Sequence, residues 1–134
     1  MSPESMQTLL HENFAPWVLA LDLTVTEVDP DHVLVRMPLG DHLSRQGGIV
    51  SGQALASLAD TSMVLAAIAH AGKFKPLATT DLHTQFLRPG TGTAIMCRAH
   101  VVRAGRALVF ARAEMTEETS GKTISTATAT FYAP

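Results

Sequence analysis

Residues 54–71 form a nearly continuous apolar stretch with few polar positions. The clearly polar side chains in it are Ser57, Asp60, Thr61, Ser62 and His70. A stretch that is apolar on almost every face is typical of a helix buried in a protein core. At roughly 1.5 Å per residue it spans on the order of 30 Å, about the width of a small domain. Gly72 follows directly, and glycine is a typical C-terminal stop for a helix.

Four β-type segments follow this helix, each rich in β-branched residues or alternating apolar and polar positions, and each ending at turn residues. They cover residues 77–87, 93–104, 107–116 and 122–132. Because the turns between them are short, the pattern predicts an antiparallel meander.

Two further strands are predicted ahead of the helix, over residues 17–28 and 32–39. Asp29-Pro30-Asp31 between them is a turn signal, so the two strands form a hairpin. Residues 5–13 are expected to be a short helix. The prediction is therefore an α+β protein of one domain, residues 1–134, in which a six-stranded antiparallel sheet wraps a long central helix.

Composition narrows the classes of function. The net charge of −2 leaves no basic footprint for nucleic acid, and Asp60 near the centre of the apolar stretch argues against a membrane span. Only 16% of residues are charged, which hints that another subunit covers part of the surface. The single cysteine, Cys97, cannot form an intrachain disulfide, and the first ten residues lack a signal-peptide pattern. A cytoplasmic location is expected.

Asp60 needs an explanation, because burying a carboxylate costs several kcal/mol unless it is paired, hydrogen-bonded or protonated. Catalysis is one explanation. The other is a structural aspartate that is bonded to Thr61, Ser62 or a partner chain.

An ordered set of short motifs over about residues 15–132 resembles the hotdog-fold thioesterases of the 4-hydroxybenzoyl-CoA and phenylacetate-degradation (PaaI-like) type. The motifs are residues 45–53 (RQGGIVSGQ), residues 58–60 (LAD), residues 79–89 (TTDLHTQFLRP) and residues 105–106 (GR). Gly52 and Asp60 match the family pattern, whereas Arg45, Ser51 and Gln53 replace its asparagine, histidine and second glycine. The resemblance implies a hotdog fold and hydrolysis of an acyl-CoA thioester, with coenzyme A as part of the substrate rather than a held cofactor.

Thioester hydrolysis needs a nucleophile or base, and donors for the charge that develops on the carbonyl oxygen. Asp60 fits the first role, and the backbone N–H groups of Gly52 and Gln53 at the helix start fit the second. The alternative is that Gly52 only shapes a tight loop and that Gln53 is an ordinary residue of the first helical turn. The eight-residue offset is roughly 12 Å along a helix, so one chain cannot bring both groups to one carbonyl carbon. Two antiparallel helices around a two-fold axis can, which predicts a site shared across a homodimer interface.

For each of the other candidate residues, an ordinary structural role is the alternative to a functional one. Thr79 would orient water or Asp60, or is simply a strand former. Ser51 would contact substrate or cap the helix. Arg45 is a phosphate contact, a partner for Asp60 or a surface charge. Arg88 and Arg106 would bind the phosphates of coenzyme A, or are solvated turn residues.

The six histidines lack metal-ligand spacing, so no metal site is expected. His83 shares a predicted strand face with Asp81 and Gln85, which either lines a pocket or is solvated.

The favoured function is hydrolysis of a medium-chain or aryl acyl-CoA by a homodimer, or by a homotetramer built as a dimer of dimers. Two rivals remain. One is a non-catalytic hotdog protein that binds an acyl-CoA or an apolar carboxylate. The other is a hydratase or dehydratase, ranked last because no histidine lies near the helix start.

Overall fold

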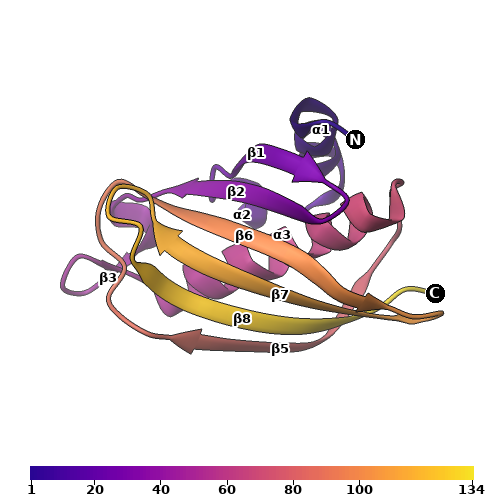
Figure 1. Cartoon of the computed structure of the whole chain (residues 1–134). Helices are drawn as coiled ribbons and strands as arrows, with labels where there is room; N and C mark the ends of the chain where they lie inside the picture. The colour runs from indigo at the N-terminus through magenta and orange to yellow at the C-terminus, as the bar shows by residue number, and fades with distance from the viewer.

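The long apolar helix lies across the concave face of a single curved sheet (Figure 1). The computed structural model describes all residues 1–134. Its sheet has six antiparallel strands, which confirms the predicted α+β architecture. The helices are α1 (Pro3–Asn13), α2 (Pro16–Leu19), a 3-10 turn η1 (Asp41–Leu43) and α3 (Gly52–Ala71). The strands of the main sheet are β1 (Thr24–Asp29), β2 (His32–Pro38), β5 (Ala78–Phe86), β6 (Ala94–Ala104), β7 (Leu108–Glu117) and β8 (Thr123–Tyr132), and a small hairpin joins β3 (Ser44–Arg45) to β4 (Ile49–Val50).

The helix α3 is the centre of the core. Leu58, Met63 and Leu65 on it are fully buried. The Ser51 Oγ accepts the Ala54 N–H at 3.2 Å and caps its start, and Gly72 with φ 75° ends it. The helix has 20 residues, and an 18-residue window within it has a mean hydropathy of 1.4, so by length and composition alone it could cross a membrane. However, 67% of that window is buried inside the protein. Most of this helix is therefore covered by other parts of the chain.

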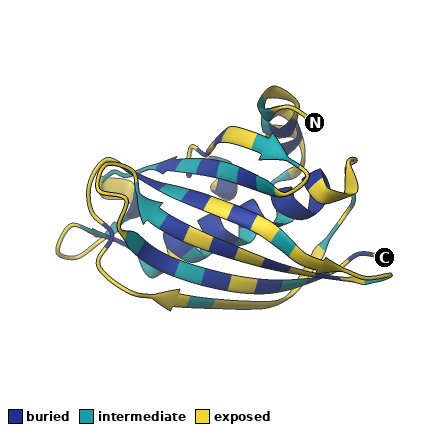
Figure 2. Ribbon diagram, in the orientation of Figure 1, coloured by how far each residue is buried: buried dark blue, intermediate teal, exposed yellow.

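The predicted meander is only partly right. The strand order is β1-β2-β6-β7-β8-β5, so β6, β7 and β8 form a meander, whereas β5 pairs with β8 at the far edge. Burial explains the difference. The inner face of β6 carries Ile95, Cys97 and Ala99, all fully buried, so β6 must lie centrally under α3. In Figure 2 burial alternates along the inner strands, while β5 is exposed along almost its whole length.

The predicted strand over residues 17–28 begins too early. Residues Pro16–Leu19 form the short helix α2, because proline at the first helical position presets a helical φ. The strand β1 starts only at Thr24 and pairs with β2 as the predicted hairpin. The predicted helix over residues 5–13 is present and starts two residues earlier, with Ser2 as its N-cap.

The two edges of the sheet differ. At the β1 edge, the Gln7 side chain of α1 donates to the Leu23 carbonyl at 2.9 Å and accepts the Val25 N–H at 2.7 Å. This side chain therefore occupies edge groups that would otherwise attract another strand. No segment of the chain pairs with the outer edge of β5, which leaves one open edge on the protein.

Candidate active site

The carboxylate of Asp60 projects from the middle of α3 and is half-buried. The Thr79 Oγ1 on β5 donates a hydrogen bond to Asp60 Oδ1 at 2.9 Å. Burial raises the pKa of the Asp60 carboxyl above its ordinary value, and the bond from Thr79 opposes this with a smaller effect. Two residues that lie 19 positions apart in the sequence are thus brought into one unit: a carboxylate with a raised pKa and a hydroxyl that orients it.

A β-bulge at Thr80 brings Thr79 to Asp60. Thr79 pairs with Phe131 and Asp81 pairs with Thr130, so Thr80 is the extra residue in the ladder. Strict alternation would place Thr79 on the same outer face as Asp81. The extra residue turns Thr79 to the inner face instead, where the side chain opposite, Phe131, is fully buried.

An apolar hollow of about 170 Å³ opens beside Asp60. Its walls come from the N-terminal segment, α3 and β5, and its lining residues are Phe14, Trp17, Val18, Ala56, Ser57, Asp60, Thr61, Val64 and Leu82. Trp17 is 62% exposed, which is unusual for a large aromatic side chain. The sequence pattern does not mark Trp17 and Phe14 as site residues, because it predicts a strand at Trp17. An exposed aromatic side chain next to a carboxylate is the signal that points to a binding surface.

The start of α3 offers two free donors. The N–H groups of Gly52 and Gln53 donate to no acceptor within the chain, because the first helical bonds come from Ala54 and Leu55. Such N–H groups at a helix N-terminus are suited to an anion or a developing oxyanion.

A second hollow, of about 380 Å³, lies at this helix start. Arg45, Gly52, Phe86 and Arg88 are among its lining residues. A Cβ atom at Gly52 would lie 3.2 Å from the Phe86 ring, so glycine lets the ring pack against the helix start. The fold therefore joins two arginines, an aromatic ring and the free N–H group of Gly52 in one hollow.

The other predicted residues are placed less centrally. Ser51 is the N-cap, the structural role expected for it. Gln53 is exposed, and its carbonyl accepts the Ser57 hydroxyl at 2.8 Å. Arg106 lies in the β6–β7 turn, at the opposite end of the sheet from Arg88, so one chain does not bring these two arginines together.

The two hollows have no lining residue in common. Gly52 lines one and Asp60 lines the other, and the two residues are separated by roughly two turns, or about 12 Å, of α3. Within one chain, the carboxylate and the free Gly52 N–H group therefore do not meet in one hollow.

The remaining His, Asp and Glu side chains and the single cysteine add no further reactive group to the site. No group of three or more His, Cys, Asp or Glu side chains is arranged to hold a metal ion. Burial raises the pKa of the Cys97 thiol to about 12, so it stays protonated, as expected of an inert core cysteine.

Residues 47–124, more than half of the chain, match the family model described as the thioesterase superfamily. The protein belongs to the thioesterase superfamily. A relative in this superfamily is mouse acyl-coenzyme A thioesterase 13, which is 24% identical over 104 residues, covering 77% of this chain and 74% of the mouse protein.

Solved structures share the fold. The zebrafish thioesterase superfamily member 2 is similar with a TM-score of 0.85 at 22% identity, covering 98% of this chain and 95% of that one. The PaaI protein of the E. coli phenylacetic acid degradation operon has a TM-score of 0.85 at 20% identity, with 98% and 93% covered. The hotdog fold expected from the sequence motifs is therefore confirmed.

Proposed function

We propose that this protein hydrolyses acyl-CoA thioesters at a site shared by two subunits. The observation that carries the proposal is the half-buried Asp60 carboxylate, held by Thr79 on the wall of an apolar hollow. Membership of the thioesterase superfamily supports the reaction, and the acyl-coenzyme A activity named for the mouse relative supports the substrate class.

The reaction breaks the bond between the acyl carbon and the sulfur of coenzyme A. Asp60 either attacks the carbonyl carbon directly or takes a proton from the water that attacks it. The oxyanion that forms is stabilised by the N–H groups of Gly52 of the partner subunit and Gln53 of the partner subunit, at the start of that subunit's α3. Its collapse expels the sulfur, which leaves as the thiol after taking up a proton. In the direct route, water then hydrolyses the acyl-aspartyl anhydride, and both routes release a free carboxylic acid.

The open edge of β5 supports a two-fold dimer. Leu82, Phe86 and Leu87 on or just after this strand are 37%, 54% and 53% exposed, so apolar surface lies along the open edge. Pairing two such edges satisfies backbone groups and covers that surface. The two-fold reverses the ends of the molecule, so Arg106 of the partner subunit comes to the end that holds Arg45 and Arg88. Together these arginines would bind the phosphates of coenzyme A.

The size of the hollow beside Asp60 favours a compact acyl group. Its volume of about 170 Å³ is close to the roughly 150 Å³ of an engineered cavity that binds benzene. Phe14 and Trp17 offer ring faces that suit an aryl group better than a long flexible chain. Aryl acyl-CoAs are therefore the first substrates to assay, followed by medium-chain acyl-CoAs.

The first test is Asp60→Asn, assayed against aryl and alkanoyl acyl-CoAs. Loss of a nucleophile or general base should lower kcat by about 10²- to 10⁴-fold. Asp81→Asn is the matched control, because Asp81 is an exposed carboxylate on the outer face of the same strand as Thr79. Unchanged turnover in a folded Asp60→Asn protein would refute the assigned role. Ligand-induced thermal stabilisation of the wild-type protein without any hydrolysis would instead select the non-catalytic binding protein.

The second test asks whether the site is shared. Asp60→Asn and Gly52→Pro each disable a different half of the site, and proline at the first helical position removes the N–H donor. In a mixed dimer, one site receives both intact halves, so random exchange should restore about a quarter of the wild-type sites. If each chain held its own complete site, mixing the two variants would restore nothing.

A further inference from the structure

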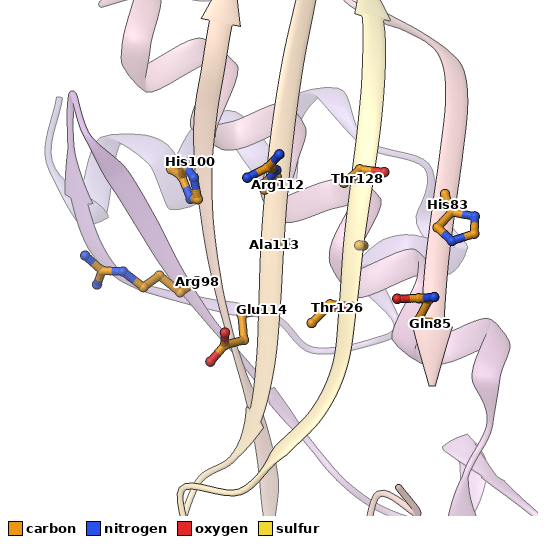
Figure 3. A pocket seen from close by; sticks show the side chains of 10 residues that line it. His83, Gln85, Arg98, His100, Arg112, Ala113, Glu114, Thr126 and Thr128 are labelled. Carbon is orange, nitrogen blue, oxygen red and sulfur yellow. The ribbon is translucent and has the colours of Figure 1, made fainter. Parts of the chain in front are cut away.

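The outer face of the sheet, opposite α3, carries a polar trough with no role in the proposed hydrolysis. Its volume is about 530 Å³, within the usual range of small-molecule sites. The lining residues are His83, Gln85, Arg98, His100, Arg112, Ala113, Glu114, Thr126, Ala127 and Thr128, from the strands β5, β6, β7 and β8 (Figure 3).

Side-chain length along neighbouring strands makes the trough. The outer positions of β8 hold the short side chains Thr126 and Thr128. The strands on either side present longer side chains, such as Arg112 on β7 and His83 on β5. Since strands are roughly 4.8 Å apart, the walls stand about 10 Å from each other over a floor of hydroxyl groups.

Register places the hydrogen-bond donors in one row. His100, Arg112, Thr128 and His83 are direct partners across β6, β7, β8 and β5. Figure 3 shows these four side chains at one level of the sheet, with Gln85 and Thr126 at the next.

None of the donors in that row is used within the chain. Neither the guanidinium of Arg112 nor either imidazole makes a hydrogen bond or ion pair. The Glu114 carboxylate lies on the β6 side of β7, away from β8 (Figure 3). On a protein of net charge −2, this row presents one fixed positive charge, the Arg112 guanidinium, between two imidazole rings.

We propose that the trough binds the phosphate group of a small phosphorylated metabolite. The phosphate lies over Thr128 and accepts charge-assisted hydrogen bonds from Arg112. His83 contacts the phosphate from the opposite wall, His100 lies beside Arg112 on the β6 side, and Gln85 and Thr126 contact the polar body of the ligand. Since the trough faces away from α3 and Asp60, this site is separate from the proposed thioesterase site.

The test measures thermal stabilisation of the protein, residues 1–134, by inorganic phosphate and by glycerol phosphate, together with NMR shifts of the histidine ring protons. The wild-type protein should show saturable stabilisation, with shifts of two of the six histidines. Arg112→Gln should weaken binding by roughly tenfold or more, because it removes the charged donor. Lys73→Gln removes the same charge in the turn after α3 and should leave phosphate binding unchanged.

The proposal is overturned if phosphate gives no saturable effect, if Arg112→Gln binds as the wild type does, or if Lys73→Gln weakens binding equally. It is also overturned if Arg112→Gln changes the size of the assembly while phosphate affinity stays the same, because the face would then contact another copy. Turnover of acyl-CoA by Arg112→Gln should match the wild type, so failure here is distinct from failure of the thioesterase assignment.

Discussion

Gly52→Pro removes one backbone hydrogen-bond donor from the candidate active site and so tests the role of that donor. Gly52 is the first residue of α3, and its N–H has no acceptor in the chain. Proline is well tolerated at this helical position, and it lacks the N–H. The residue before it is also compatible, because Ser51 has φ −68° and ψ 147°, the extended conformation that proline requires of its predecessor.

Gly52→Pro should lower the rate of catalysis much more than it changes the stability of the fold. Removing one oxyanion donor in an acyl-transfer site lowers kcat by about 10²- to 10³-fold, or about 2.7–4 kcal/mol. The effect on folding should be small, because restricting the unfolded chain stabilises by about 0.4–1 kcal/mol. Against this, the new Cβ meets the Phe86 ring at 3.2 Å, and the ring must move by a few tenths of an ångström.

Gly52→Ala is the matched control, because it adds the same Cβ against Phe86 but keeps the N–H. The assay is steady-state hydrolysis of an aryl acyl-CoA, with urea denaturation to verify folding. We expect kcat to fall for proline and to stay within a few-fold of wild type for alanine. The reasoning is refuted if both variants lose activity equally, since displacement of Phe86 would then be the cause. It is also refuted if the proline variant remains fully active.

Three further predictions follow, two on the Asp60 carboxylate and one on the packing of Gly90 against Val50. Thr79→Val removes the donor to Asp60, so the acid limb of the kcat/KM profile should move to higher pH and kcat/KM should fall by about tenfold, whereas Thr79→Ser should keep the wild-type profile. Asp60→Asn should be more stable than wild type at neutral pH. Because the pKa of Asp60 is raised in the folded protein, the native state holds more protons than the unfolded state, and wild-type stability falls as pH rises from 3.8 through the folded pKa. Thermal melts should therefore show the difference in stability between Asp60→Asn and wild type closing below pH 3.8. A difference that does not depend on pH would contradict this. Gly90→Ala forces a Cβ against Val50 Cγ1, so urea unfolding should report about 1–3 kcal/mol of destabilisation. An unchanged midpoint would show that Val50 moves freely.

The sequence alone determined the elements whose signals are local. The apolar run of α3, its serine cap and its glycine stop are read from neighbouring residues, and the structure has all three. The β1–β2 hairpin follows in the same way from Asp29-Pro30-Asp31, and the β6–β7–β8 meander follows from short turns between long strands. The offset of Gly52 from Asp60 is also set by sequence, since the rise of a helix is constant.

Tertiary structure decided what depends on packing between distant segments. Thr79 and Thr80 are equally good strand formers, so nothing local marks the bulge that turns Thr79 toward Asp60; the fit of β5 against both β8 and α3 selects it. The edge place of β5 has the same origin, because the strand with the least buried surface is the one that the core can leave outside. Trp17 belongs with these cases, because Pro16 diverts its segment into a helical turn, and only the packed chain brings that turn to the hollow beside Asp60.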